Sequence, residues 1–137
     1  MTFSKAQIDK LADRFFGAVE AGDIETFVSC YGPDARIWHS RDEADTDVQQ
    51  NREMQEMFKA RVKDRRFEIV RRHIFDGGFV QEHVVHGIMP DGSAMRLPVL
   101  LIAHLDDQGL FKRISEYFDS AKSPMAGLKQ KHVPVTE

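Results

Sequence analysis

Three short turn sequences in the second half of the chain constrain its fold more than any other feature. Asp76-Gly77-Gly78, Pro90-Asp91-Gly92 and Asp106-Asp107-Gln108-Gly109 separate runs of strand-like composition. The runs span residues 66–76, 79–89, 94–105 and 110–119. Turns this short join antiparallel neighbours, because parallel strands need a crossover of about a dozen residues or more. The sequence therefore predicts an antiparallel meander.

The first half of the chain carries helical signals instead. Ser4 and Gln7 form a capping-box pattern, apolar residues follow at helical spacing, and Gly22 can end this helix in the left-handed conformation. Asp23 can cap a short second helix, which stops before Gly32-Pro33. The sequence thus predicts two successive helices at its start.

A third helix completes the predicted N-terminal half. Residues 35–40 have an extended pattern, and Thr46 or Asp47 can cap the helix that follows. Three helices ahead of an antiparallel meander predict an α+β fold, with the helices packed against one face of the sheet. We expect a single domain over residues 1–122 and an extended C-terminal tail over residues 123–137.

Composition limits the class of protein. The chain has 137 residues, 42% of them hydrophobic and 30% charged, which is typical of one soluble domain. Its net charge of -3 disfavours a nucleic-acid partner, and its apolar runs are too short for a membrane partner. A single cysteine, Cys30, allows neither an internal disulfide nor a cysteine metal cage. We therefore expect a cytoplasmic protein.

Metal and nucleotide cofactors are not expected from the sequence. His83 and His86 fall on opposite faces of one predicted strand, and the chain has neither HExxH nor a helical histidine pair. Gly77-Gly78 lies in a hairpin rather than in a strand-to-helix phosphate loop. Cys30 is interpreted as a buried apolar residue.

Alternate residues of two predicted strands combine aromatic and ionisable side chains. Counting with a period of two gives one face of the second strand to Phe79, Gln81, His83, Val85 and Gly87. The same counting gives one face of the last strand to Phe111, Arg113, Ser115, Tyr117 and Asp119. Such faces can line an apolar pocket that holds a few placed polar groups. The alternative is a half-exposed sheet with ordinary surface polar residues.

Three motifs resemble a known family. They are Gly22-Asp23-Ile24-Glu25, Pro33-Asp34-Ala35-Arg36-Ile37-Trp38 and Glu116-Tyr117-Phe118-Asp119. In their order and spacing, residues 4–122 resemble the nuclear-transport-factor-2-like superfamily, and most of all its SnoaL-like and limonene-epoxide-hydrolase-like members. The resemblance implies a cone-shaped fold of three helices on a strongly curved, mainly antiparallel sheet, usually as a homodimer. Members catalyse isomerisation, polyketide cyclisation or epoxide hydrolysis in the cone, and several only bind ligands.

The resemblance also places individual residues. Asp119 matches the aspartate that ends the last strand of the epoxide hydrolases, where an Asp-Arg-Asp set activates water. In this chain His83 stands in place of the arginine, and Val85 in place of the second carboxylate. Trp38 and Ser40 stand where those hydrolases carry a tyrosine and an asparagine. These departures weigh against epoxide hydrolysis.

His83 and Asp119 are the predicted catalytic residues. In a plain meander one strand separates them, so their backbones lie about 10 Å apart before curvature. Sheet curvature or a bridging water would have to bring them together. If they meet, Asp119 holds His83 in one tautomer and raises its basicity, which gives an acid/base dyad suited to neutral pH. The alternative is a pocket-lining histidine without a catalytic role.

The predicted substrate-binding residues surround this dyad. They are Trp38, Ser40, Tyr117, Val85, Phe58 and Met54. Trp38 and Tyr117 would shape an apolar wall, and the Tyr117 hydroxyl could donate to a substrate oxygen. Met54 and Phe58 are core residues first and pocket residues second.

The sequence leaves two functional hypotheses. In the first, the chain is an enzyme that performs cofactor-free acid/base chemistry on a small lipophilic oxygenated molecule, as an isomerase, cyclase or hydratase does. In the second, it is a non-catalytic ligand-binding or dimerisation domain. Either way, a homodimer is expected through the outer sheet face, where counting places Val80, Val84, Ile88, Ile114 and Phe118.

Overall fold

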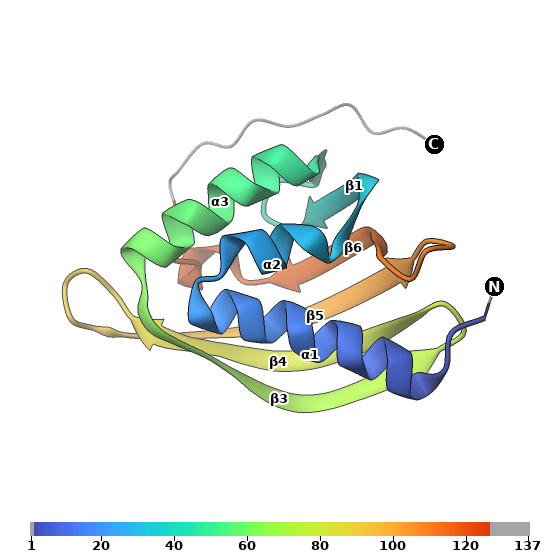
Figure 1. The fold of residues 1–137 in the computed structure, drawn as a ribbon. Helices are drawn as coiled ribbons and strands as arrows, with labels where there is room; N and C mark the ends of the chain where they lie inside the picture. Colours follow the sequence, from blue (N-terminus) through green and yellow to red (C-terminus); the bar gives the residue numbers. More distant parts are fainter. Residues whose placement is uncertain (1, 127–137) are drawn as a thin grey trace.

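The computed structural model describes residues 2–126, and Figure 1 shows how their helices and strands are arranged. Helix α1 (Lys5–Ala21) begins at Ser4, whose hydroxyl accepts from the Gln7 N–H while the Gln7 side chain accepts from the Ser4 N–H. The helix ends at Gly22, whose φ of 71° is the left-handed conformation that glycine adopts without steric cost. Both predicted ends of this helix are confirmed.

The other two helices also begin at the predicted capping residues. Helix α2 (Ile24–Ser29) begins at Asp23, whose carboxylate accepts from a backbone N–H of the first turn. Helix α3 (Val48–Arg61) begins at Asp47, which forms a reciprocal capping box with Gln50. Local hydrogen bonding at helix starts therefore follows the sequence directly.

A short hairpin lies between α2 and α3. Strand β1 (Tyr31–His39) starts four residues earlier than the extended run predicted over residues 35–40. Strand β2 (Ala44–Thr46) pairs with it in antiparallel fashion and was not predicted. Its central residue, Asp45, is 1% exposed and forms an ion pair with Arg113, at 3.1 Å between Oδ1 and a guanidinium nitrogen. A buried aspartate gives no hydrophobic alternation, so pattern counting misses such a strand.

The rest of the chain forms the predicted meander. Its strands are β3 (Lys63–Phe75), β4 (Gly78–Ile88), β5 (Ala94–Leu105) and β6 (Phe111–Phe118). Within residues 2–126, the sheet has the strand order β2-β1-β6-β5-β4-β3. Strands β1 and β6 are parallel, and the other neighbours in this order are antiparallel. The parallel pair joins the two halves of the chain into one sheet.

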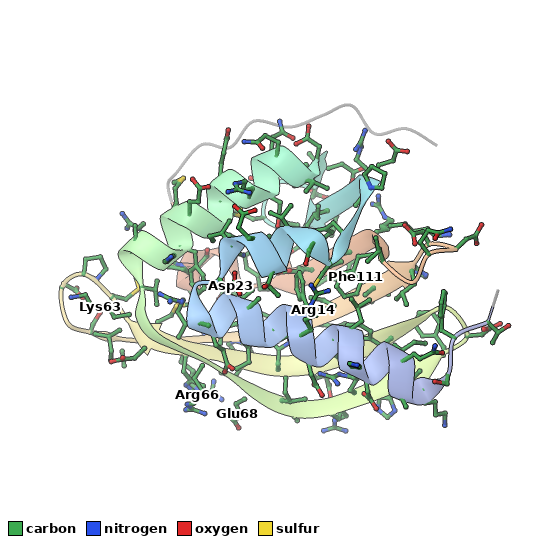
Figure 2. All side chains as sticks on the ribbon, viewed as in Figure 1. Arg14, Asp23, Lys63, Arg66, Glu68 and Phe111 are labelled. Carbon is green, nitrogen blue, oxygen red and sulfur yellow. The ribbon has the colours of Figure 1, made fainter. Side chains whose placement is uncertain are left out.

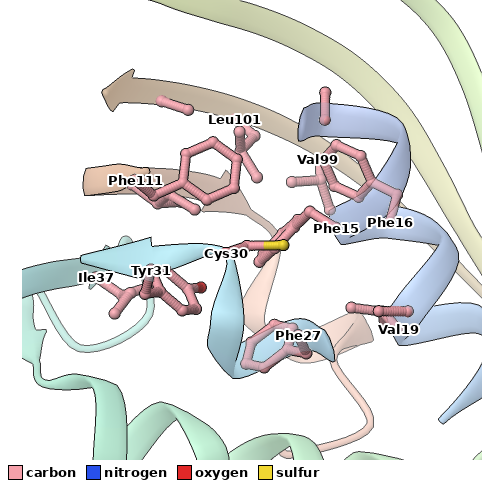
Figure 3. Packing of buried hydrophobic residues seen from close by; sticks show 14 of the residues in the cluster. Phe15, Phe16, Val19, Phe27, Cys30, Tyr31, Ile37, Val99, Leu101 and Phe111 are labelled. Atoms are coloured by element: carbon pink, nitrogen blue, oxygen red, sulfur yellow. The ribbon is translucent and has the colours of Figure 1, made fainter. Parts of the chain in front are cut away.

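The helices of the described chain lie on one face of this sheet (Figure 1). Between the two layers, Phe15 of α1 stacks on Phe27 of α2, with 5.0 Å between ring centroids. The same ring meets Tyr31 of β1 and Phe111 of β6 edge to face, at 5.6 and 5.0 Å (Figure 3). This aromatic cluster holds the layers together. The predicted α+β fold is confirmed.

The predicted inner face of β4 is also confirmed. Phe79 and Gln81 are 0% exposed, His83 is 3% exposed, and Val85 is buried too. Val84, between them, points to the opposite face, as a period of two requires.

Strand β6 contains a bulge that period-two counting does not foresee. His104 of β5 pairs with Arg113, whereas its neighbour Leu105 pairs with Phe111. Lys112 is therefore an extra residue on β6, and an extra residue shifts the alternation of side chains by one.

The bulge reverses the predicted faces of β6. Ile114 is fully buried, and Glu116 and Phe118 line the space under the helices. The prediction that Ile114 and Phe118 face outward is therefore wrong. The prediction of an inner position is likewise wrong for Arg113, Ser115 and Tyr117, whose cross-strand neighbours lie on the outer face.

Arg65 ties the start of β3 to the ends of two helices. Its guanidinium donates to the Val19 and Glu20 carbonyls at the end of α1, at 3.1 and 3.3 Å. It also donates to the Lys59 and Val62 carbonyls at the end of α3, at 3.2 and 2.6 Å. The last carbonyls of a helix have no hydrogen-bond partner within the helix. The side chain of Arg65 therefore donates to carbonyls at the C-terminal ends of both α1 and α3.

We expect Arg65→Met to lower the free energy of unfolding by about 3 kcal/mol, because several charge-assisted hydrogen bonds, most of them to part-buried carbonyls, are lost together. Urea denaturation of the two proteins measures the difference. The matched control is Arg66→Met, whose side chain is exposed on the side of β3 away from the helices (Figure 2). It should change stability by no more than about 0.5 kcal/mol. Equal effects of the two substitutions would contradict this role of Arg65.

Two further observations concern the ends of the chain and its exterior. Over residues 2–126, no helix has both the length and the apolar composition needed to cross a membrane. After the short 3₁₀ helix η1 (Ser120–Lys122), Met125 packs into the core with 5% of its surface exposed. The predicted tail thus begins as a packed segment, and residues 127–137 lie outside the described residues.

Candidate functional site

A cavity of about 110 Å³ lies between the helices and the inner face of the sheet. Most of its wall is aromatic or aliphatic, with Phe16 of α1 and Val99 of β5 as examples. Its polar lining includes Tyr31, His39, Arg41, Asn51, His83 and Glu116. An apolar cavity with a few placed polar groups is the usual form of a small-molecule site.

Glu116 is the carboxylate of this cavity. About 25% of its side chain is exposed, and its Oε2 lies 3.9 Å from Nε2 of His39 on the neighbouring strand β1. Burial raises the pKa of Glu116, and the nearby His39 opposes this rise. The Nδ1 atom of His39 is buried and has no hydrogen-bond partner among the described residues. The pair can therefore hold and release a proton inside an apolar site.

Tyr31 and Asn51 extend the polar end of the cavity. The Tyr31 hydroxyl donates to Oδ1 of Asn51 over 3.3 Å. Burial and the neighbouring Glu116 raise the pKa of Tyr31 well above its usual range, so its hydroxyl stays protonated. In Figure 3 the Tyr31 ring lies beside Phe27, at the boundary between α2 and the sheet. Tyr31 thus supplies a neutral hydroxyl next to the carboxylate.

His83 lies on β4, away from the Glu116 strand. Its ring contacts the rings of Phe16 and Phe67, at centroid distances of 5.2 and 5.1 Å. Its Nδ1 lies 2.8 Å from Nε2 of Gln81. Burial, with a smaller effect from the charge of Arg72, lowers the pKa of His83 to about 4. The imidazole is therefore neutral at pH 7.

The segment after η1 lies at the mouth of the cavity. Ser123, Pro124 and Met125 belong to the lining, and two arginines hold this segment in place. Arg41 donates to the Met125 carbonyl over 3.0 Å, and Arg61 of α3 donates to the Pro124 carbonyl over 3.3 Å. Access to the cavity therefore depends on this segment.

Several predicted site residues do line the cavity. Val85 of β4 and Phe58 and Met54 of α3 are among its lining residues, together with His83. Helical spacing places Met54 and Phe58 over the sheet, on the same side of α3 as Asn51.

The structure does not bring Asp119 to His83. Strand β6 ends at Phe118, and the exposed Asp119 caps η1, with its carboxylate accepting from the Ala121 N–H over 3.0 Å. Asp119 is not among the described residues that line the cavity. The strand therefore ends one residue before the carboxylate on which the predicted dyad depends.

Three predicted substrate-binding residues lie elsewhere. Trp38 and Tyr117 contact each other across β1 and β6, with 5.1 Å between ring centroids, and Tyr117 is 46% exposed. The Ser40 hydroxyl bridges the backbone of Phe118, donating to its carbonyl and accepting from its N–H. None of the three lines the cavity within the described part of the chain. Trp38 and Tyr117 occupy the outer face because His39 and Glu116, their neighbours in sequence, occupy the inner one.

Glu116, His39, Tyr31 and Asn51 are the functional candidates that sequence reasoning missed. Glu116 was assigned to the wrong face because of the bulge at Lys112. For Asn51 a signal existed, since it precedes Met54 and Phe58 by three and seven residues and thus shares their helical face. Among residues 2–126, no group of three or more His, Cys, Asp or Glu side chains is arranged to hold a metal ion.

The sequence model of the SnoaL-like domain matches residues 12–114. This span covers most of the chain. The protein therefore belongs to the SnoaL-like family, within the nuclear-transport-factor-2-like superfamily. A search of curated proteins finds no match to its sequence.

Solved structures with the same fold are distant in sequence. PrhC from Penicillium brasilianum NBRC 6234 is 17% identical, with a TM-score of 0.77 over 86% of this chain and 83% of that one. BvnE pinacolase from Penicillium brevicompactum is 15% identical, with a TM-score of 0.77 over 89% and 90%. An LEH-like epoxide hydrolase from M. tuberculosis is 16% identical, with a TM-score of 0.72 over 85% and 86%. At these identities the likeness shows the fold.

The low pKa of His83 makes the stability of the protein depend on pH. The unfolded chain binds a proton on this histidine near pH 6.5, and the folded chain only near pH 4. The free energy of unfolding should therefore fall by about 3 kcal/mol as the pH drops through this window, and this contribution levels off below it. NMR titration of the ring gives the folded pKa directly.

Urea denaturation at pH 7 and pH 4.5 measures the linked change in stability. His83→Gln should remove this part of the pH dependence, whereas His73→Gln, at an exposed position of β3, should retain it. A folded-state pKa near 6.5 for His83 would show that the ring is not desolvated.

Proposed function

We propose that the protein binds a small lipophilic oxygenated molecule in the cavity and performs cofactor-free acid/base chemistry on it, with Glu116 as the proton-transfer group. The observation that carries this proposal is a carboxylate with a raised pKa inside an apolar cavity, 3.9 Å from a histidine. A carboxylic acid whose pKa lies nearer to neutral pH accepts and returns protons more effectively than an exposed one with an ordinary pKa.

The roles of the neighbouring groups follow from their positions. Glu116 takes a proton from the bound molecule in one step and returns it at another atom in a later step. His39 faces Glu116 across β1 and β6, with 3.9 Å between its Nε2 and Oε2 of Glu116. Tyr31 keeps its proton and donates a hydrogen bond to Oδ1 of Asn51, which leaves the hydroxyl oxygen as an acceptor near Glu116.

His83 would contact the ligand from the wall of the cavity opposite Glu116. In the register of the sheet, His83 pairs with Val99, and Val99 pairs with Phe118, so β4 and β6 lie two strand spacings apart, about 10 Å. A ligand lying over Val99 can therefore reach both His83 and Glu116. At neutral pH the uncharged imidazole of His83 serves as a hydrogen-bond donor rather than as the base.

The cavity volume limits the size of the ligand. At about 110 Å³ the cavity is smaller than the cavity of about 150 Å³ that holds benzene, so as it stands it suits a molecule smaller than a substituted aromatic ring. A larger molecule requires the segment of Ser123, Pro124 and Met125 to move. We also propose that the helices and sheet enclose this space as a cone, as the family resemblance implies.

Related proteins of the same fold support chemistry of this kind. Their names include a pinacolase, an LEH-like epoxide hydrolase and a putative SnoaL-like polyketide cyclase from Shewanella denitrificans OS-217. None of these names implies a particular substrate for this chain. The cytoplasmic location expected from the sequence stays a prediction.

Hydrogen–deuterium exchange tests the proposed role of Glu116. We expect wild-type protein to accelerate exchange at the α-carbon of small aromatic ketones such as acetophenone in D₂O, followed by ¹H NMR. Glu116→Gln should reduce the enzymatic rate by at least about 100-fold, because general acid/base groups contribute factors of this size. Glu53→Gln, on the exposed side of α3, is the matched control and should keep the rate. Exchange that survives Glu116→Gln would refute the assignment.

The main alternative is a ligand-binding domain without catalysis. The distance of 3.9 Å between His39 and Glu116 is longer than a direct hydrogen bond, which favours a pair that only tunes the polarity of the cavity. Ketone binding by the wild-type protein without any α-carbon exchange would support this alternative.

We further propose that the protein forms a homodimer through the outer face of the sheet. This face exposes Leu100, Tyr117 and Pro98, and a shallow hollow beside Leu100 is lined by Val84. Apolar groups gathered on one open sheet face are typical of a surface that is covered by a partner. The family resemblance likewise implies a homodimer.

Light scattering after size exclusion tests the dimer. We expect wild-type protein to have twice the mass of one chain at micromolar concentration, and Leu100→Asp to have the mass of one chain, because a charge is buried in the interface. Met57→Asp is the control, since Met57 is exposed to a similar extent, 41% against 38%, but lies on helix α3. Dissociation in both variants, or in neither, would refute the proposed surface.

A further inference from the structure

A chain of hydrogen bonds connects helix α1 to the cavity through the side chain of Arg72. One guanidinium nitrogen of Arg72 donates to Asp9 and Asp13 of α1, at 2.9 and 3.0 Å. Its Nε donates to Oε1 of Gln81 over 2.7 Å. The Nε2 of Gln81 in turn lies 2.8 Å from Nδ1 of His83. Two strand residues, Arg72 and Gln81, thus link surface carboxylates to the imidazole of His83.

The types of donor and acceptor along this chain fix the proton of His83. A guanidinium has only donors, so the oxygen of the Gln81 amide must face Arg72. The amide NH₂ group must then face His83 and donate to it, which requires an unprotonated Nδ1. A neutral imidazole with a bare Nδ1 carries its proton on Nε2. The hydrogen-bond order therefore determines which tautomer is present.

We infer that Arg72 and Gln81 are positioning residues that hold His83 as the neutral Nε2–H tautomer, so that the cavity presents a fixed donor and selects ligands with an acceptor oxygen. The cavity as a ligand site rests on the proposed function, whereas the tautomer does not. No other ring donor of the cavity is held by a comparable chain within the described residues.

Burial keeps this chain in one arrangement. Gln81 is 0% exposed, and the side chain of Arg72 is 12% exposed. The guanidinium also lies over the ring of Phe79, 5.6 Å from its centroid. Turning the Gln81 amide by half a turn would place its NH₂ group against Arg72, donor against donor, in a site without water access. The amide therefore cannot exchange its two ends.

The remaining nitrogen of His83 is left for the ligand. Phe16 and Phe67 pack on the imidazole ring and limit its rotation. Within residues 2–126, Nε2 of His83 makes no hydrogen bond to the protein, while the residue lines the cavity. An N–H that faces an apolar cavity without a protein partner gains a hydrogen bond when a bound molecule accepts from it. A carbonyl, ether or hydroxyl oxygen satisfies it, and a hydrocarbon does not.

Long-range ¹H–¹⁵N correlation spectra of the free protein at pH 7 test the tautomer without any ligand. We expect the Nε2–H tautomer of His83 in the wild type. Gln81→Glu should move the proton to Nδ1, because a carboxylate there accepts where the amide donated. Arg72→Met should give a mixture of tautomers, because the amide is then free to turn. The exposed His73 provides an internal control and should be unaffected by either substitution.

A wild-type spectrum with the proton on Nδ1 would overturn the inference even if neither variant folds. It would leave the proposed function standing, since that depends on Glu116 and is measured by α-carbon exchange. An unchanged tautomer in folded Gln81→Glu would overturn the positioning role of Gln81.

Two probes of equal shape test the selection of ligands. Acetophenone carries a carbonyl, and α-methylstyrene carries a C=CH₂ group in the same place. We expect the wild type to bind acetophenone about tenfold more tightly, the effect of one hydrogen bond to a buried donor. Gln81→Glu should bring this ratio close to one. Equal affinities in a wild type with the Nε2–H tautomer would refute ligand selection by His83 and would count against the cavity as the ligand site.

Discussion

One extra residue in strand β6 determines what the cavity contains. The bulge at Lys112 lets Phe111 and Ile114 both pack into the core, and it places Glu116 and Phe118 on the inner face beyond it. Without this residue, alternation would put Tyr117 under the helices and Glu116 in the opposite layer. The inward position of the carboxylate, its contact with the histidine on β1, and the outward position of Tyr117 all depend on this shift.

Burial in the cavity shifts the pKa values of Glu116 and His83 in opposite directions. Burial raises the pKa of Glu116 and lowers the pKa of His83 to about 4. In both cases the apolar surroundings disfavour the charged form of the group. At neutral pH this leaves a group that can exchange a proton and a separate group that can only donate a hydrogen bond. Such a division is what acid/base chemistry on an oxygenated molecule requires.

Those features that depend on local chemistry were predictable from the sequence. The capping residues Ser4, Asp23 and Asp47, the turn at Gly77 and the inner face of β4 all follow from hydrogen bonding and periodicity over a few neighbouring residues. The prediction of Asp119 as a site residue used the same counting through the bulge, and its side chain caps a 3₁₀ helix. His83 was identified through the resemblance and the face of β4. Its partner Gln81 was placed on the same face, but not recognised as a hydrogen-bonding group.

The sequence by itself determined the α+β class, the antiparallel meander and the resemblance to the SnoaL-like family, because these follow from turns, caps and the order of motifs. Only the tertiary structure decided which carboxylate faces the cavity, since the register of β6 against β5 is set by pairing between strands. It also decided the tautomer of His83, because Arg72 on β3 reaches Gln81 across the sheet only after the strands have paired. Contacts between strands, rather than the order of residues, determine which polar groups face this cavity and how they are protonated.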